Sequence, residues 1–98
     1  MSTIAMTSGG FNPPLPVSLV TVLGDGTTTL ERVSVNKHSV PVPNGSITAD
    51  HTSANVYVDA TTFTGLVTCL QNPAKKALIS LTYSGGTVTG VTYNCIVK

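Results

Sequence analysis

The sequence contains no tryptophan and few charges: only 9% of its 98 residues are ionised, five of them basic and four acidic. A soluble chain is usually about one-quarter charged. A net charge of +1 creates no field that would attract nucleic acid or an anionic membrane surface. We therefore expect no nucleic-acid partner, and with so few ionisable groups a catalytic set is hard to assemble.

Long hydrophobic runs are also missing. No stretch approaches the roughly 20 apolar residues that a membrane helix needs, so no membrane span is expected. The first six residues, MSTIAM, show neither the basic segment nor the sustained apolar segment of a signal peptide. A cytoplasmic location is the default expectation, and the mature form of an exported protein is the alternative.

Cysteine and histidine are scarce. Two cysteines, Cys69 and Cys95, are too few for a disulfide scaffold, and their spacing alone cannot bring their Cα atoms together. We expect two small buried thiols, with a disulfide as the second interpretation. The histidines, His38 and His51, show no ligand spacing with the few carboxylates, so neither a metal site nor a cofactor is expected.

Threonine and valine dominate what is present. The chain has sixteen threonines and 13 valines, and 41% of its residues are apolar, too many for a disordered chain. Residues 1–14 are the exception, because the glycines at 9–10 and the prolines at 13–14 predict a flexible N-terminal arm. Residues 15–98 are then a single β-rich domain.

Alternating apolar residues predict the strands. A central strand is expected over 15–23, and a returning strand over 28–36, where Leu30 is out of phase with Val33 and Val35. A β-bulge near Glu31 would let all three face the core. Further along, Asn44–Gly45 predicts a tight turn, and the glycines at 85–86 predict a C-terminal hairpin of residues 76–83 and 91–97.

Residues 59–72 have two interpretations. Apolar residues at helical spacing, namely Phe63, Leu66, Val67 and Leu70, favour a helix with Asp59 as a possible N-cap. The threonines and the glycine of this segment are poor helix formers and favour a strand. We expect a mainly β (α+β) domain, an antiparallel sheet or sandwich of six to seven strands with one short helix near 60–72. An all-β sandwich, with 62–70 as a strand, is the alternative.

For function, the sequence favours a non-catalytic interaction or structural module, surface-exposed, secreted or virion-associated, over an enzyme. Its expected partner is another protein or a second copy of the chain, reached through a sheet edge or an uncharged hairpin face. The threonines that would present that face are Thr82, Thr87, Thr89 and Thr92.

Two alternatives belong to other functional classes. The first is a small-ligand pocket between helix and sheet, lined by Phe63, Tyr83 and Tyr93. The second is a small enzyme or metal site that uses Asp50 and His51, the one carboxylate–histidine neighbour pair without a structural explanation.

Overall fold

Seven strands and one helix make up the part of the chain that the structure, a computed structural model, describes: residues 2–12, 19–24, 26, 28–38 and 44–97. The elements are β1 (Ser2–Asn12), β2 (Leu19–Gly24), β3 (Arg32–His38), β4 (Asn44–Ile47), β5 (Ser53–Asp59), α1 (Ala60–Gln71), β6 (Lys75–Ser84) and β7 (Thr87–Val97). The mainly β fold with one short helix is confirmed, and the alternative in which 62–70 forms a strand is wrong.

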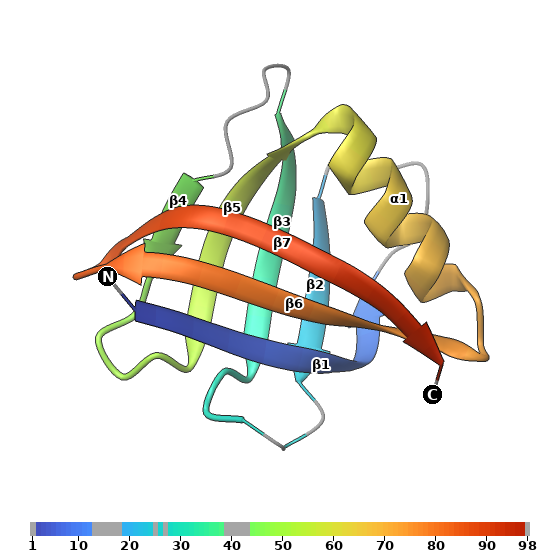
Figure 1. Cartoon of the computed structure of the whole chain (residues 1–98), viewed down its shortest axis with the longest axis horizontal. Helices are drawn as coiled ribbons and strands as arrows, with labels where there is room; N and C mark the ends of the chain where they lie inside the picture. The colour runs from blue at the N-terminus through green and yellow to red at the C-terminus, as the bar shows by residue number, and fades with distance from the viewer. Residues whose placement is uncertain (1, 13–18, 25, 27, 39–43, 98) are drawn as a thin grey trace.

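The strands form one mixed and strongly curled sheet (Figure 1). Neighbouring strands follow the order β1-β2-β3-β5-β4-β7-β6, and β6 pairs back onto β1. Every pair is antiparallel except β3 with β5, which run parallel from Arg32↔Ser53 to His38↔Asp59. The expectation of an antiparallel sheet therefore fails at this one pair, because β4 folds back onto the far side of β5.

The contact between β4 and β7 is the shortest in the ring. It consists of two residue pairs, Gly45↔Val88 and Ser46↔Thr87, since β4 has 4 residues and β7 has 11. Beyond Val88, no strand among the described residues pairs with this side of β7. The sheet is consequently open along most of one strand.

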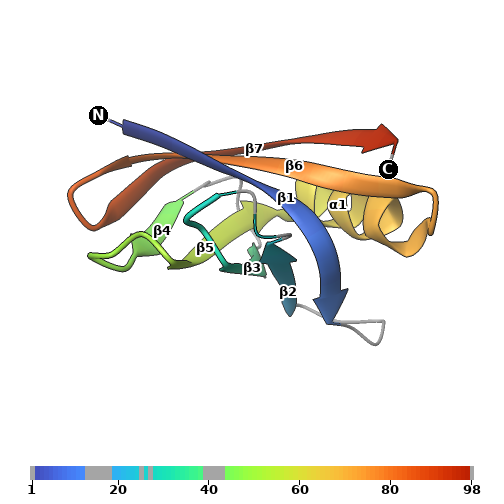
Figure 2. The same ribbon diagram turned by 90° about the horizontal axis from the view of Figure 1, so that it is seen from below.

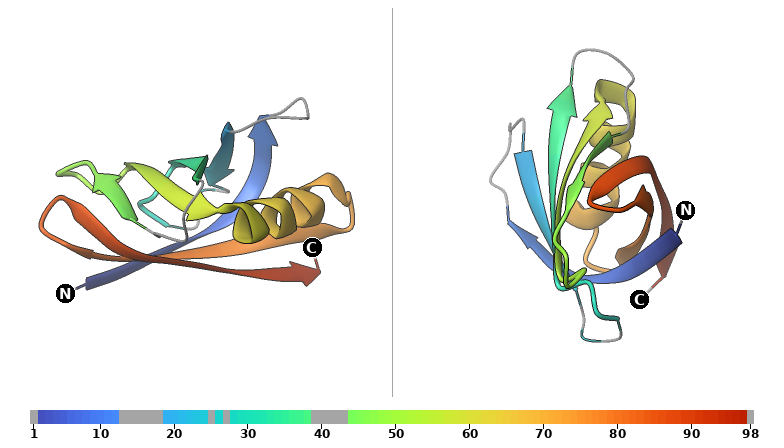
Figure 3. Two further views of the ribbon diagram at one scale, coloured as in Figure 1. Left: turned by 90° about the horizontal axis from the view of Figure 1, so that it is seen from above. Right: turned by 90° about the vertical axis from the view of Figure 1, so that its left-hand side faces the viewer.

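Helix α1 lies on the concave side of the sheet, between the β6–β7 hairpin and the strands β3 and β5 (Figure 3). The side chain of Asp59 caps its N-terminus by accepting a hydrogen bond from the backbone N–H of Thr62 at 3.2 Å. The predicted apolar face is confirmed and also includes Cys69. Packing of this face outweighs the poor helix propensity of the segment.

The hydrophobic core fills the space between the curled sheet and the helix. Its members are Val20, Val22, Leu30, Val33, Val35, Ile47, Ala54, Val56, Val58, Phe63, Leu66, Val67, Cys69, Leu70, Ala77, Ile79, Leu81 and Val88. The strands contribute alternate residues, so the opposite side chains of β2, β3 and β5 form the outer, convex face.

The N-terminal segment differs from its prediction. A flexible arm over 1–14 is wrong for Ser2–Asn12, which form β1; residues 13 and 14 lie outside the described residues. β1 pairs with β6 along Ser2–Thr7 and with β2 along Ser8–Asn12, so it joins the two halves of the sheet (Figure 2). A register shift between Ser8 and Gly10 lies where the strand changes partner, so the glycines mark an irregularity within a strand.

The segment from β2 to β3 confirms the predicted burial of three apolar residues, but without the β-bulge that was expected to allow it. Leu30, Val33 and Val35 are all buried, yet the β2–β3 register is regular from Leu19↔Asn36 to Leu23↔Arg32 and contains no bulge. Leu30 reaches the core from the irregular segment that precedes β3. Of the predicted strand over 15–23, residues 15–18 lie outside the described residues.

The expected turn at Asn44–Gly45 is wrong, because both residues belong to β4. Gly45 is needed there for a different reason: a Cβ on it would collide with the carbonyl oxygen of Asn55 and lie 2.7 Å from the Cα of Val56 on β5. The glycine therefore allows the backbones of β4 and β5 to approach closely.

Replacing Gly45 with alanine should destabilise the fold by more than about 2 kcal/mol, because backbone atoms of β5 would have to move. Urea denaturation monitored by circular dichroism measures the change. Gly86→Ala is the matched control, since a Cβ there meets nothing closer than the carbonyl oxygen of Ile47 at 3.7 Å. Equal stability of the two variants would contradict the close approach of β4 and β5.

Candidate functional site

Asp50 belongs to a tight turn between β4 and β5. One of its carboxylate oxygens accepts hydrogen bonds from the Thr48 hydroxyl (2.7 Å), the Thr52 hydroxyl (2.9 Å) and the Thr52 backbone N–H (3.2 Å). The hydrogen bonds from Thr48 and Thr52 hold the pKa of Asp50 below its ordinary value. This carboxylate therefore has a structural role, which the sequence analysis had not identified.

The side chain of His51 contacts Tyr83. Its backbone has a φ of 59°, the only positive value outside glycine among the described residues, and its N–H donates to the Thr48 carbonyl at 2.9 Å. Its ring lies 4.8 Å from that of Tyr83, with 3.5 Å between Nδ1 and the phenolic oxygen. Asp50 and His51 are adjacent in sequence but are not paired with each other.

The described residues contain no cluster of three or more His, Cys, Asp or Glu side chains that could hold a metal ion. His38 lies at the end of β3, where its ring makes an edge contact with Tyr57 at 6.0 Å. The two histidines thus belong to separate aromatic contacts on different parts of the fold.

The three aromatic residues expected to line a ligand pocket each have different surroundings. Phe63 is 3% exposed and belongs to the core, with the Lys37 ammonium 6.0 Å from its ring centre. Tyr93 packs against the helix where Gly65 leaves room for its hydroxyl, and Tyr83 contacts His51. The structure does not bring the three rings together as one accessible wall.

The four threonines of the predicted interaction surface all lie on the β6–β7 hairpin. Thr87, Thr89 and Thr92 are exposed, whereas Thr82 is half-buried. The hydroxyl of Thr89 donates to the Thr82 carbonyl at 3.2 Å, next to the register shift that follows Thr82. The hairpin itself, turning at Gly85 with a φ of 61°, is confirmed.

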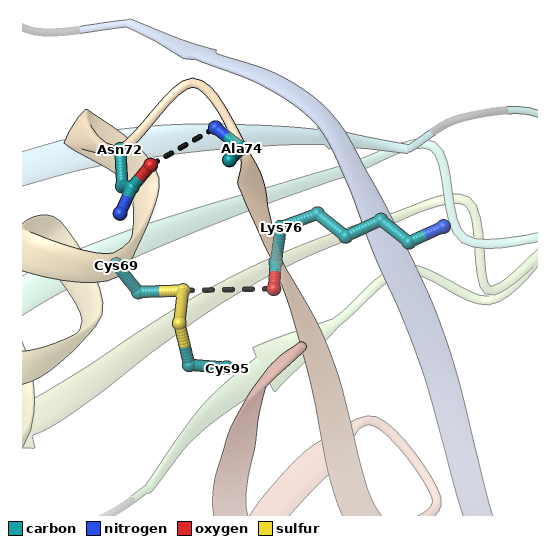
Figure 4. Close-up of a disulfide and its surroundings, with 5 residues drawn as sticks. All are labelled: Cys69, Asn72, Ala74, Lys76 and Cys95. Atoms are coloured by element: carbon teal, nitrogen blue, oxygen red, sulfur yellow. Dashed lines mark hydrogen bonds between the residues drawn. A yellow bond between two sulfur atoms is a disulfide. The ribbon is translucent and has the colours of Figure 1, made fainter. Parts of the chain in front are cut away.

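Cys69 and Cys95 form a disulfide, so the preferred expectation of two free thiols fails (Figure 4). Their Cα atoms are 5.9 Å apart, and the bridge joins the last turn of α1 to β7. The sulfur of Cys69 lies 3.5 Å from the Lys76 carbonyl, which is a packing contact because a disulfide sulfur has no proton to donate. Cys69 is buried and Cys95 is exposed, so only one end of the bridge lies in the core.

The free edge of β7 is the first surface that the fold creates. From Thr89 to Val97 no residue is buried, and Val97 is 70% exposed, although Ala77, Ile79 and Leu81 on the neighbouring strand are at most 1% exposed. Every residue of this stretch is therefore at least partly exposed, although Val91 and Tyr93 also pack against the core. Its outer backbone N–H and C=O groups have no strand partner within the described part of the chain.

A polar hollow on the outer face of β3, β5 and β4 is the second surface. It has a volume of about 420 Å³ and is lined by Arg32, Ser34, Ser46, Ile47, Thr48, Ser53, Ala54 and Asn55. The hollow could not be predicted from the sequence, because it depends on the parallel pairing of β3 with β5, which aligns residues distant in sequence. The only signal of the hollow in the sequence is the set of polar residues that alternate with apolar ones along each strand.

The chain matches no protein-family model, no curated protein and no solved structure. No helix in the described part of the chain is long and apolar enough to cross a membrane. The free edge of β7 and the polar hollow are therefore the two candidate functional surfaces of this protein.

Asp50→Asn should lower the free energy of unfolding at neutral pH. It should also make that free energy fall less steeply than in the wild type as the pH is lowered. Because the folded pKa lies below the ordinary value of 3.8, the ionised carboxylate stabilises the fold above that pH. That contribution disappears as the pH falls through the lowered folded pKa. Urea denaturation at a series of pH values tests this, with Glu31→Gln as an exposed carboxylate control; identical pH profiles for wild type and D50N would contradict it.

Replacing both cysteines with alanine should destabilise the protein by about 3–4 kcal/mol, the chain-entropy value for a loop of this length. The bridge closes a loop with a sequence separation of 26. Thermal unfolding of the oxidised protein, the reduced protein and the double variant measures the effect. Reduction should lower the midpoint of the wild type and leave that of the variant unchanged, and an unchanged wild type would contradict a bridge.

Proposed function

We propose that this protein is a non-catalytic interaction or structural module that joins a second copy of itself by antiparallel pairing of β7 with β7. The observation that supports the proposal is the free backbone edge of β7 from Thr89 to Val97. An unpaired row of N–H and C=O groups is a template for another strand.

The edge lacks charged side chains, proline and bulges, three features that usually prevent strand addition. Natural edges are protected by charged side chains, proline, bulges or a covering segment. No charged residue and no proline occurs between Thr87 and Val97. The only register shift of the β6–β7 pair lies between Thr82 and Tyr83, so from Gly90 to Val97 the strand is regular.

A second copy is the occupant that the composition supports. Two β7 strands running antiparallel would place uncharged side chains opposite one another, so no like charges meet within this segment. A net charge of +1 adds little repulsion between whole molecules. Pairing would also cover part of Val97, the most exposed of the large apolar side chains.

The disulfide supports an exported setting for this module. Disulfides persist in oxidising compartments and are rare in the reducing cytosol. The bridge joins Cys69 of α1 to Cys95 of β7, within the strand that carries the free edge. We therefore favour a surface, secreted or virion-associated location over the cytoplasmic default.

Sedimentation velocity of the full chain over a range of concentrations tests the proposal. An edge contact buries less surface than a standard interface of about 1,600 Å², so we expect reversible dimers at about 0.1 mM. Thr92→Lys should weaken dimerisation at least about tenfold, because it would place an ammonium group in the contact of each copy.

Thr29→Lys is the matched control, an exposed threonine in the connection between β2 and β3 whose replacement adds the same charge. It should dimerise like the wild type. A strict monomer at about 1 mM, or equal weakening by both variants, would overturn pairing through β7.

A further inference from the structure

The polar hollow on the outer face of β3, β5 and β4 presents a binding surface that does not depend on pairing of β7. Backbone register aligns its polar residues in rows across the three strands: Ser34, Asn55 and Ser46 in one, with Arg32 and Ser53 in the next. The hollow opens to the side of the sheet opposite the core, and its volume of about 420 Å³ lies within the usual range for small-ligand sites.

Arg32 gives the hollow its charge. The guanidinium group forms no hydrogen bond or ion pair with any described residue, and no carboxylate is among the residues that line the hollow. A guanidinium presents five N–H donors in a fork that matches the two oxygens of a carboxylate. Within the described part of the chain nothing occupies this group, so it can bind an anionic ligand.

The adjoining rows carry uncharged hydrogen-bonding groups. The hydroxyls of Ser34, Ser46 and Ser53 make no hydrogen bond with a described residue and can both donate and accept. Ser34 and Ser53 are half-buried, so they form part of the wall of the hollow. Such paired donors and acceptors match the vicinal hydroxyls of a sugar.

Two hydrogen bonds hold the side chain of Asn55, which lines the hollow. The Asn55 side chain accepts a hydrogen bond from the amide of Asn36 at 2.7 Å and donates one to the Tyr57 hydroxyl at 3.3 Å. These contacts fix the orientation of the Asn55 amide and leave one amide N–H free. Tyr57, 36% exposed, places an aromatic ring beside the row. A ligand would thus meet a preorganised amide.

Asp50 is an acidic group in contact with Thr48, one of the residues that line the hollow. Its carboxylate accepts from Thr48 and Thr52 within its own turn and does not line the hollow. The Thr48 hydroxyl, which does line the hollow, gives its only proton to Asp50. The same oxygen accepts hydrogen bonds from the backbone N–H groups of Thr52 and Ser53, so Thr48 has no hydrogen-bonding capacity left for a ligand, whereas the serines can donate.

We propose that the hollow binds a saccharide that carries a carboxylate, with Arg32 binding the carboxylate and the serines and Asn55 binding the sugar hydroxyls. The guanidinium sets the charge of the ligand, and the rows of hydroxyl and amide groups set its polarity. An apolar ligand would leave these groups without hydrogen-bond partners, and the guanidinium would repel a cationic ligand.

Titration of the ¹⁵N-labelled full chain with sodium glucuronate, glucose or sodium acetate, followed by ¹H–¹⁵N spectra, tests this. Glucuronate should shift the resonances of Asn55 and its neighbours and bind about tenfold more tightly than either other probe, since a charge-assisted pair adds to the sugar contacts. Arg32→Gln should reduce glucuronate binding to the level of glucose.

Lys37→Gln is the matched control, because it removes one positive charge from the same strand at a side chain directed toward Phe63. It should bind glucuronate like the wild type. Equal binding of acetate and glucuronate would overturn the saccharide assignment, and equal losses in both variants would overturn the role of Arg32. Absence of shifts around Asn55 with all three probes would overturn the site itself, whatever the oligomeric state.

Discussion

The difference in length between β4 and β7 is the constraint on which the rest of this fold depends. β4 can pair with only the first residues of an eleven-residue strand, so the ring of strands stays open beyond Val88. β7 continues with β6 as its only strand partner, and its inner face would lie bare without a cover. Helix α1 supplies that cover from the concave side, and the Cys69–Cys95 bridge fixes the helix to the strand. The free edge of β7 is thus a consequence of the architecture.

The same chain path creates the second surface. The chain leaves β3, forms the short β4 and returns as β5 between the two, so β3 and β5 run parallel. This pairing aligns the polar halves of alternating strands on the convex face and gathers the hollow around Arg32. Gly45 is the local requirement for this arrangement, because only a residue without a side chain allows β4 to approach β5 so closely. The two surfaces differ in kind: one offers unpaired backbone, the other unpaired side chains.

Local signals predicted the C-terminal hairpin, the helix with its Asp59 cap, and the burial of Leu30, Val33 and Val35. What failed depended on long-range pairing. Ser2–Asn12 look flexible in sequence, yet β1 is held by hydrogen bonds to two strands distant in the chain. Asn44–Gly45 has the composition of a turn, whereas the glycine serves a close approach to β5. The interaction surface was placed on hairpin threonines, but a free edge follows from the absence of a neighbouring strand, which alternation within one strand cannot reveal.

Central to this account is the pairing of β7 with β7, and isotope-filtered NOE spectroscopy on an equimolar mixture of labelled and unlabelled chains tests it most directly. Antiparallel strands bring the α-protons of directly opposite, non-hydrogen-bonded residues close enough for strong NOEs, because their Cα atoms are about 4.5 Å apart. Pairing of β7 with β7 predicts intermolecular NOEs between β7 residues in the range Thr89–Val97. Intermolecular NOEs confined to other elements, or none at a concentration of about 1 mM, would contradict it.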